Sequence, residues 1–376
     1  MLLSEDHRAV QDAVRAYVQD RIAPQAAAWD KNHHFPKDEL RGLAGLGCYG
    51  VAVPTEWDGA GLDYLALSVI LEEIAAGDGA TSTVVSVNNC PVCSILMAWA
   101  TDAQKQAWLR PLARGDMLGA FCLTEPHVGS QADGLKTTAT KDGDHYVLNG
   151  VKQFITSGKN GDVAIVMAVT DKAAGKKGIS AFIVPTNTAG YVVARIEDKM
   201  GQHASDTAQI LFESCRVPAA NRLGEEGQGL KIALSGLEGG RIGIASQSVG
   251  MARAAFEAAL QYSKQRVAFG KPIFEHQALQ FRLGEMATQI EAARQLIHHA
   301  ASLKDAGVPC LKEAAMAKLF ASEMAERVCS AAIQVFGGYG YVSDFPVERI
   351  YRDVRVCQIY EGTSDVQKIL IGRALA

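Results

Sequence analysis

The sequence lacks long apolar runs and a strong charge bias, and these absences exclude several broad classes of protein. No stretch approaches the roughly 18 consecutive apolar residues that a membrane-spanning helix needs. Lys and Arg number 37 against 41 Asp and Glu, so neither nucleic acid nor an anionic membrane is indicated as a partner. The N-terminus resembles neither a signal peptide nor an Arg-rich transit peptide. We therefore expect a cytoplasmic protein with no nucleic-acid or membrane partner.

A disulfide framework is also missing, because the eight cysteines are scattered along 376 residues. Only Cys90 and Cys93 form a C-x-x-C pair, and no second pair or nearby histidine completes a zinc site. The pair precedes an apolar run, so we interpret it as two buried thiols. Redox or metal chemistry at the pair is the alternative. We predict no metal site.

Hydrophobic periodicity divides the chain into three predicted domains. Residues 1–117 carry apolar side chains at three- and four-residue spacing, which predicts helices. Residues 118–225 contain short runs rich in Val and Ile with no helices between them, which predicts an antiparallel sheet. Residues 226–376 contain long apolar stripes typical of a helical bundle. The fold class is therefore expected to be α+β, with several domains.

The central domain offers the most specific local predictions. Residues 145–155 are expected to form a hairpin that turns at Asn149-Gly150, a pair that type I′ turns favour. Further strands are predicted at residues 163–169, 179–184, 191–196 and 210–212.

One glycine pattern imitates a nucleotide-binding motif. Gly45, Gly47 and Gly50 fit G-x-G-x-x-G, which has meaning only between a strand and a helix. The preceding residues look helical, and Val-Ala-Val-Pro follows. We interpret this segment as the end of a helix and a loop.

Three short segments could carry chemistry. Residues 121–130 (FCLTEPHVGS) suit a polar loop facing an anion or a ring edge, although a plain turn also fits. Residues 154–158 (FITSG) are an ordinary strand end when taken alone. Ser364 and Gln367 have capping-box spacing and predict a helix start, which places Glu361 just before a helix N-terminus. Glu361 either complements the helix dipole or acts as a carboxylate base.

Together these segments resemble the acyl-CoA dehydrogenase family, of the short-chain or short-branched-chain type, over essentially the whole chain. The further motifs that carry the resemblance lie at residues 199–207, 217–229, 239–245, 266–273, 276–277, 334–340 and 351–353. The resemblance implies a helical N-terminal domain, a central β domain and a C-terminal four-helix bundle. It also implies a homotetramer built as a dimer of dimers.

The resemblance further implies FAD as the cofactor and assigns residues to it. Contacts from the same subunit would be Phe121, Leu123, Thr124, Gly129 and Ser130, with Phe154, Ile155 and Thr156 beside the isoalloxazine ring. Contacts to the FAD of a neighbouring subunit would be Arg266, Phe269, Gln277, Gln334, Gly337 and Gly338. Thr363 and Asp365 would close the adenosine side. The acyl-CoA would meet Ser130, Glu238, Arg241, Tyr360 and Gly362.

The implied reaction is the α,β-dehydrogenation of a short or branched-chain acyl-CoA to the trans-2-enoyl-CoA. Glu361 would remove the α-proton, the β-hydride would move to flavin N5, and electrons would pass to an electron-transfer flavoprotein. Hydrogen bonds from the FAD ribityl 2′-hydroxyl and from the Glu361 N–H would polarise the thioester carbonyl. Such an activity belongs to fatty acid β-oxidation or branched-chain amino acid catabolism.

The chain departs from the family pattern at three positions: His127 replaces a usual Gly, Phe154 a common Trp and Asp365 a common Gln. Glu238 is the other candidate base, because some relatives carry theirs on the helix of Arg241. Their base aligns nearer to position 240, however, where this chain has no acid.

Three other classes of function remain open. An acyl-CoA oxidase, a desulfinase or a flavin monooxygenase would share the fold. A flavin- or CoA-binding protein without turnover, and a helical interaction scaffold, are the alternatives from other classes.

Overall fold

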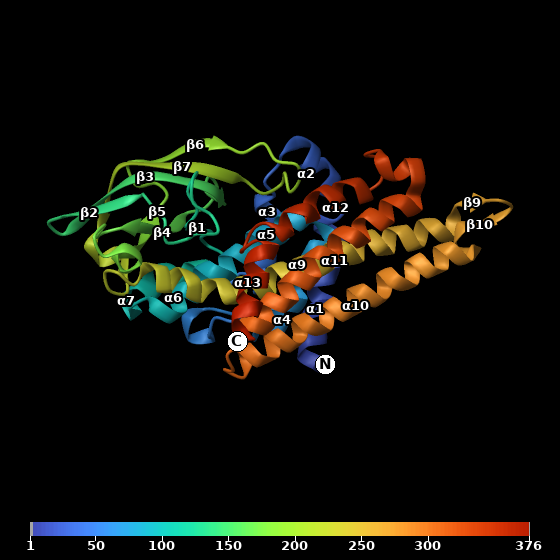
Figure 1. Ribbon diagram of the computed structural model, residues 1–376, viewed down its shortest axis with the longest axis horizontal. Coiled ribbons are helices and arrows are strands. Elements are labelled where there is room, and N and C mark those ends of the chain that lie inside the picture. The colour runs from blue at the N-terminus through green and yellow to red at the C-terminus, as the bar shows by residue number, and fades with distance from the viewer. Residues whose placement is uncertain (1–2, 376) are drawn as a thin grey trace.

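The computed structural model describes residues 3–375 and has helices at both ends of the chain and a sheet in the middle. In Figure 1 the sheet lies at one end of an elongated molecule, and the helices fill the centre and the opposite end. The predicted α+β class and the helix–sheet–helix order are confirmed. The exact domain limits stay a prediction.

Several of the N-terminal helices begin at residues whose side chains satisfy free backbone N–H groups. The Ser4 hydroxyl accepts from the His7 N–H, and the Asp63 carboxylate accepts from the Ala66 N–H. The helices are α1 (Glu5–Tyr17), α2 (Ala26–Asn32), α3 (Lys37–Gly45), α4 (Tyr64–Gly77), α5 (Gly79–Val87), α6 (Ser94–Trp99), α7 (Asp102–Gln104) and α8 (Arg110–Arg114). Because α3 ends at Gly45, the glycine pattern closes a helix, as expected.

The central domain is one eight-stranded sheet in the order β6-β7-β3-β2-β4-β5-β8, with β1 beside β4. Its strands are β1 (Gly119–Cys122), β2 (Thr138–Asp142), β3 (His145–Thr156), β4 (Val163–Val169), β5 (Ile179–Pro185), β6 (Tyr191–Ile196), β7 (Thr207–Pro218) and β8 (Arg222–Leu223). Most strand pairs are antiparallel, as expected, but β1 and β2 both pair with β4 in parallel, which the expectation of an antiparallel sheet missed. The long segment between β1 and β4 provides the crossover that parallel pairing requires.

The predicted hairpin turn at Asn149-Gly150 is also wrong, because both residues lie inside β3. The chain turns instead at residues 143–144, where Asp142 pairs with His145. Gly150 sits at a register shift between β3 and β7, and a methyl group there would lie 2.6 Å from the Thr137 Cα. The glycine is therefore required by the close approach of Thr137, the residue before β2, and not by a turn.

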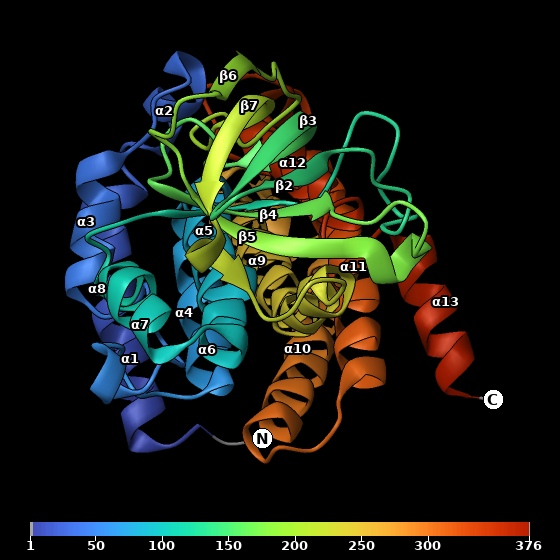
Figure 2. The same ribbon diagram turned by 90° about the vertical axis from the view of Figure 1, so that its left-hand side faces the viewer.

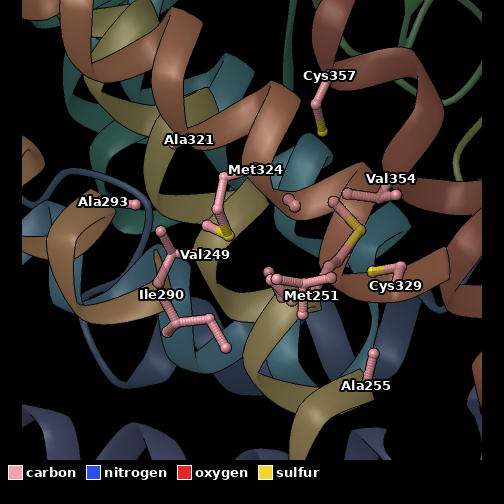
Figure 3. Close-up of a cluster of buried hydrophobic side chains, with 14 of the residues drawn as sticks. Val249, Met251, Ala255, Ile290, Ala293, Ala321, Met324, Cys329, Val354 and Cys357 are labelled. Carbon is pink, nitrogen blue, oxygen red and sulfur yellow. The ribbon is translucent and has the colours of Figure 1, made fainter. Parts of the chain in front are cut away.

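The C-terminal domain is a bundle of long helices. They are α9 (Gly229–Gln265), α10 (Gln277–Asp305), α11 (Leu311–Phe336), α12 (Val347–Val354) and α13 (Ser364–Ala374), with a small β9–β10 hairpin (Val267–Ala268 and Lys271–Pro272) after α9. Figure 3 shows the core between α9, α10 and α11, where alanines alternate with Met251, Ile290 and Met324. Small side chains let these helices approach closely.

Helix α9 connects the two ends of the molecule. It starts against β5 of the sheet (Figure 2), where Gly229 packs on Ser180, and runs to the β9–β10 hairpin at the far tip of the molecule (Figure 1). Its 37 residues make a rod about 55 Å long. None of the helices in residues 3–375 combines the length and the hydropathy needed to cross a bilayer.

Candidate active site

Glu361 occupies a strained turn between α12 and α13. Its φ is +55° and that of Gly362 is +87°, a left-handed conformation that few residues other than glycine adopt. The predicted helix start is confirmed within one residue, but the predicted capping box is wrong. Thr363 is the cap and accepts from the Val366 N–H, whereas the Gln367 amide turns back to the Glu361 carbonyl at 3.2 Å.

The turn is held from inside the protein through its carbonyl groups. The Gly362 oxygen accepts from Lys318 Nζ and from Gln367 Nε2, each at 2.8 Å. Both donor side chains are fully buried. The Glu361 N–H, in contrast, has no acceptor within the described range 3–375. It is therefore a free donor beside the carboxyl group.

The Glu361 carboxyl lies in an enclosed environment. Its Oε2 atom is buried and has no hydrogen-bond partner in the described chain. A methyl group on Gly240 would lie only 2.8 Å from this oxygen, so the helix α9 presses directly against it. Burial raises the pKa of Glu361 to about 7, against the opposing charges of Arg241 and Lys318. A carboxyl that titrates near neutrality suits a general base.

Arg241 lies beside this carboxyl on α9 and is nearly inaccessible. Its Nε is buried without a hydrogen-bond partner among residues 3–375. Burial lowers its pKa, while the charges of Glu361 and Glu238 raise it. An unpaired buried donor next to an unpaired buried acceptor marks a place for a polar ligand.

Glu238 and Tyr360 direct their polar groups elsewhere. Glu238 accepts from Lys304 Nζ at 3.0 Å and from the Cys310 thiol at 3.6 Å. The Tyr360 hydroxyl donates to Gln247 Oε1 at 3.0 Å. Their contact with a substrate stays a prediction, since protein partners already engage both groups.

The loop after β1 is anchored at its base by a buried ion pair. Lys152 Nζ lies 2.8 Å from Glu125 Oε1, and both side chains are essentially inaccessible. The other Glu125 oxygen accepts from the Lys136 N–H, and the Thr124 carbonyl accepts from the Gln153 N–H. These bonds fix the start of the loop against β3.

The remaining residues of this loop differ in exposure. Phe121 and Thr124 are half-buried and Leu123 is buried, whereas Gly129 and Ser130 are exposed. The loop thus has a fixed base and a tip that can reach a ligand.

Phe154 stands out on β3, although its segment is unremarkable in the sequence. It has a φ of +59° and lies in the register shift between Lys152 and Ile155. Its ring is 62% exposed, while Ile155 is buried and Thr156 half-buried. A bulge of this kind re-aims one side chain, and here it turns an aromatic ring outward from the strand.

One loop brings the strand end and the Glu361 turn together. Gln202 Nε2 donates to the Tyr360 hydroxyl at 3.3 Å. Four residues later the Asp206 carbonyl accepts from the Ser157 N–H at 3.2 Å. The loop 199–206 therefore contacts both the FITSG strand end and the residue next to Glu361.

Most of the other predicted cofactor residues lie far from Glu361, whereas Thr363 and Asp365 follow it closely in the chain. Arg266 is 25 residues beyond Arg241 on α9, which corresponds to about 38 Å of helix. Around it a pocket of about 650 Å³ is lined by Arg266, Gly337, Gly338 and aromatic rings. Phe269, Gln277 and Gln334 are exposed near this end, and Phe269 is 95% accessible. Asp365, on the first turn of α13, is also exposed.

The interpretation of Cys90 and Cys93 as buried thiols is confirmed, since all eight cysteines are buried and unpaired. Burial raises the pKa of Cys90, which disfavours a reactive thiolate. His33, Asp198 and His203 place potential metal-ligand atoms within 4.8 Å of one another. Both ring nitrogens of His203 already face oxygens of Asp30 and Lys199, however.

The sequence analysis missed the polar residues that support the site, namely Lys318, Gln367, Lys152 and Gln202. Lys318 gave one usable signal, because it is a lone charge inside the apolar stripe of α11. Lys152 and Gln202 carry no such signal, since their partners are distant in the sequence. Gln367 has near partners, but its spacing from Ser364 indicated a capping box instead.

The Glu125–Lys152 pair leads to a prediction about stability. Lys152→Met should lower the free energy of unfolding by about 3–5 kcal/mol, because it leaves a buried carboxylate without its cation. Denaturant unfolding of the purified variant measures this. Lys141→Met, at an exposed position on β2, is the matched control and should be nearly neutral. A loss below about 1 kcal/mol for Lys152→Met would show that the pair does not hold the loop.

Three family models match the chain in order. They are the acyl-CoA dehydrogenase N-terminal domain at residues 4–116, the middle domain at residues 120–215 and the C-terminal domain at residues 227–376.

Individual relatives match over almost the full length. The short-chain specific acyl-CoA dehydrogenase of Rattus norvegicus is 46% identical and covers 98% of this chain and 90% of its own. Butyryl-CoA dehydrogenase from Megasphaera elsdenii is 42% identical, with a TM-score of 0.97 over 100% of this chain and 99% of its own. A chain from the structure reported for the electron transferring flavoprotein of Acidaminococcus fermentans is 45% identical, with a TM-score of 0.98 over 100% and 99%.

These matches span all three parts of the chain and agree with the order helix, sheet, helix. The chain therefore belongs to the acyl-CoA dehydrogenase family, whose members are oxidoreductases that use FAD.

Proposed function

We propose that the protein converts short acyl-CoA thioesters to trans-2-enoyl-CoA with Glu361 as the catalytic base. The observation that carries the proposal is the Glu361 carboxyl, whose Oε2 atom is buried without a partner on a turn whose own N–H is free. Burial raises the pKa of this carboxyl to about 7. The names of the short-chain and butyryl-CoA relatives support a short acyl substrate.

The residues fit a bound FAD in two separate regions. The exposed Phe154 ring and the Gly129–Ser130 loop tip offer an aromatic face and polar groups near the sheet. The pocket at Arg266 combines a cation with glycines that leave space for a close approach. When bound, FAD supplies the hydride acceptor of the reaction.

The protein groups perform the proton chemistry. Ionised Glu361 removes the α-proton of the thioester, and burial keeps its proton affinity high enough for this task. The free Glu361 N–H donates a hydrogen bond to the thioester carbonyl oxygen and stabilises the negative charge that develops there. The buried positive charge of Arg241 acts in the same direction.

The separation of the two cofactor regions supports assembly into dimers and then a homotetramer. Arg266 lies about 38 Å along α9 from Arg241, which flanks Glu361, so the Arg266 pocket is remote from the candidate base of its own chain. The exposed Phe269 ring at the tip is typical of an interface residue. We infer that the Arg266 region binds the FAD of a neighbouring subunit.

An electron-transferring flavoprotein is proposed as the electron acceptor. The support comes from a similar chain in the structure reported for such a flavoprotein. An oxidase on the same fold would instead produce stoichiometric peroxide in air, which an anaerobic and aerobic comparison distinguishes.

Glu361→Gln should retain FAD and lose turnover by roughly three orders of magnitude, because a positioned base is removed. Glu238→Gln is the matched control and should be far milder. A dye-linked assay with butyryl-CoA measures both. Flavin reduction that survives in Glu361→Gln and vanishes in Glu238→Gln would transfer the role to Glu238.

The kcat/KM of the unmodified enzyme should fall as the pH decreases below about 7, since protonated Glu361 cannot act as a base.

The acyl preference should lie between butyryl or isobutyryl and about hexanoyl size, because similar proteins are named as a short-chain specific and a butyryl-CoA dehydrogenase. The measurement is kcat/KM for straight and branched acyl-CoA thioesters of increasing length. A maximum at palmitoyl-CoA would contradict the assignment.

Arg266→Ala should weaken FAD retention and the oligomer together, because its guanidinium lines a pocket that the neighbouring subunit's cofactor enters. Sedimentation combined with flavin absorbance measures both quantities. Arg216→Ala, an exposed arginine on β7, is the control that should leave them unchanged. A monomeric Arg266→Ala protein with full flavin content would disprove the shared site.

A further inference from the structure

Lys318 is an unusual residue for the centre of an apolar helix. Its side chain is fully buried within α11, where lysine is rare unless it is paired. The ammonium donates to the Gly362 carbonyl at 2.8 Å, and no carboxylate within the described residues forms an ion pair with it. The charged groups that influence it are Glu361, Arg241 and Glu323, together with the Cys357 thiol. Burial lowers the pKa of Lys318 to about 8.

The hydrogen bonds of Lys318 and Gln367 restrain adjacent peptide groups. Lys318 fixes the peptide that follows Gly362, while Gln367 contacts the carbonyls of both Glu361 and Gly362. Glu361 and Gly362 both have positive φ, a backbone conformation that costs free energy for a non-glycine residue such as Glu361. Such a conformation persists only where surrounding contacts enforce it. These two buried side chains are the contacts that the structure shows.

A neutral donor would satisfy the Gly362 carbonyl with a smaller desolvation cost than a buried ammonium. The charge therefore requires its own explanation. It lies close enough to Glu361 for each group to influence the ionisation of the other. A positive charge on the carbonyl side of the turn favours the carboxylate form without forming an ion pair that would block the base.

We propose that Lys318 is a positioning residue for Glu361, which holds the Glu361–Gly362 turn through the Gly362 carbonyl and favours the ionised carboxyl group by its charge. The proposal rests on the proposed role of Glu361 as the base.

Lys318→Met removes both the charge and the donor at similar side-chain length. Lys312→Met, on the exposed first turn of the same helix, is the matched control. In Lys318→Met we expect FAD content to be retained, kcat for butyryl-CoA at pH 7 to fall about 10- to 100-fold, and KM to change much less. The acid limb of the pH profile should move upward by about one pH unit, because the carboxylate loses a stabilising positive charge. Unchanged kcat and an unshifted limb would overturn the proposal.

A double-variant cycle separates this role from a general structural one. Combined with Glu361→Gln, Lys318→Met should cost little further activity, because its effect passes through Glu361. An equal loss in the Glu361→Gln background would show that Lys318 acts independently of the base and would overturn the proposal.

Two further measurements keep the test decisive. A crystal structure of Lys318→Met should show the Glu361–Gly362 turn displaced from its positive-φ conformation, and an unmoved turn would refute the role of Lys318 in holding it. If instead the unmodified protein reduced no flavin with acyl-CoA, that result would refute the proposed function and leave the structural comparison of the turn valid. If the Met variant does not fold, Lys318→Gln retains a donor without the charge, and an unshifted acid limb in that variant would overturn the electrostatic part.

Discussion

The site depends on keeping one carboxyl group inside the protein and still able to ionise near neutral pH. Burial against α9 raises the proton affinity of Glu361, and two cations, Arg241 and Lys318, limit that rise without forming an ion pair with it. Full neutralisation by a salt bridge would have lowered the pKa and occupied the oxygens. The absence of a side chain at Gly240 is what allows the helix to approach the carboxyl so closely.

Buried polar groups connect the turn that carries Glu361 to all three domains. The Tyr360 hydroxyl contacts Gln247 of α9 and Gln202 of the central domain, and both glutamines bond to Thr83 of α5. Fully satisfied networks of this kind are rigid, whereas loss of one member leaves its partners unpaired in a low dielectric. The position of the base is therefore a property of all three domains together.

Much of the fold was predictable because it follows local periodicity: the long apolar helices and the Val- and Ile-rich strands form where their patterns indicate. The larger errors arose where a distant segment decided the outcome. Asn149-Gly150 has the composition of a turn, yet Gly150 is needed for the approach of Thr137. Glu361 was identified from its motif, but the support by Lys318 and the bulge that exposes Phe154 depend on tertiary contacts that no local pattern encodes.

The central claim is that Glu361, held on this turn, removes the α-proton of the substrate. The most direct test is anaerobic stopped-flow reduction of the holoenzyme by α-deuterated butyryl-CoA across the pH range. The account predicts a primary isotope effect on the reduction rate, a rate that rises with an ionisation near pH 7, and loss of both in Glu361→Gln. A rate without an isotope effect and without that ionisation, unchanged in Glu361→Gln, would contradict it.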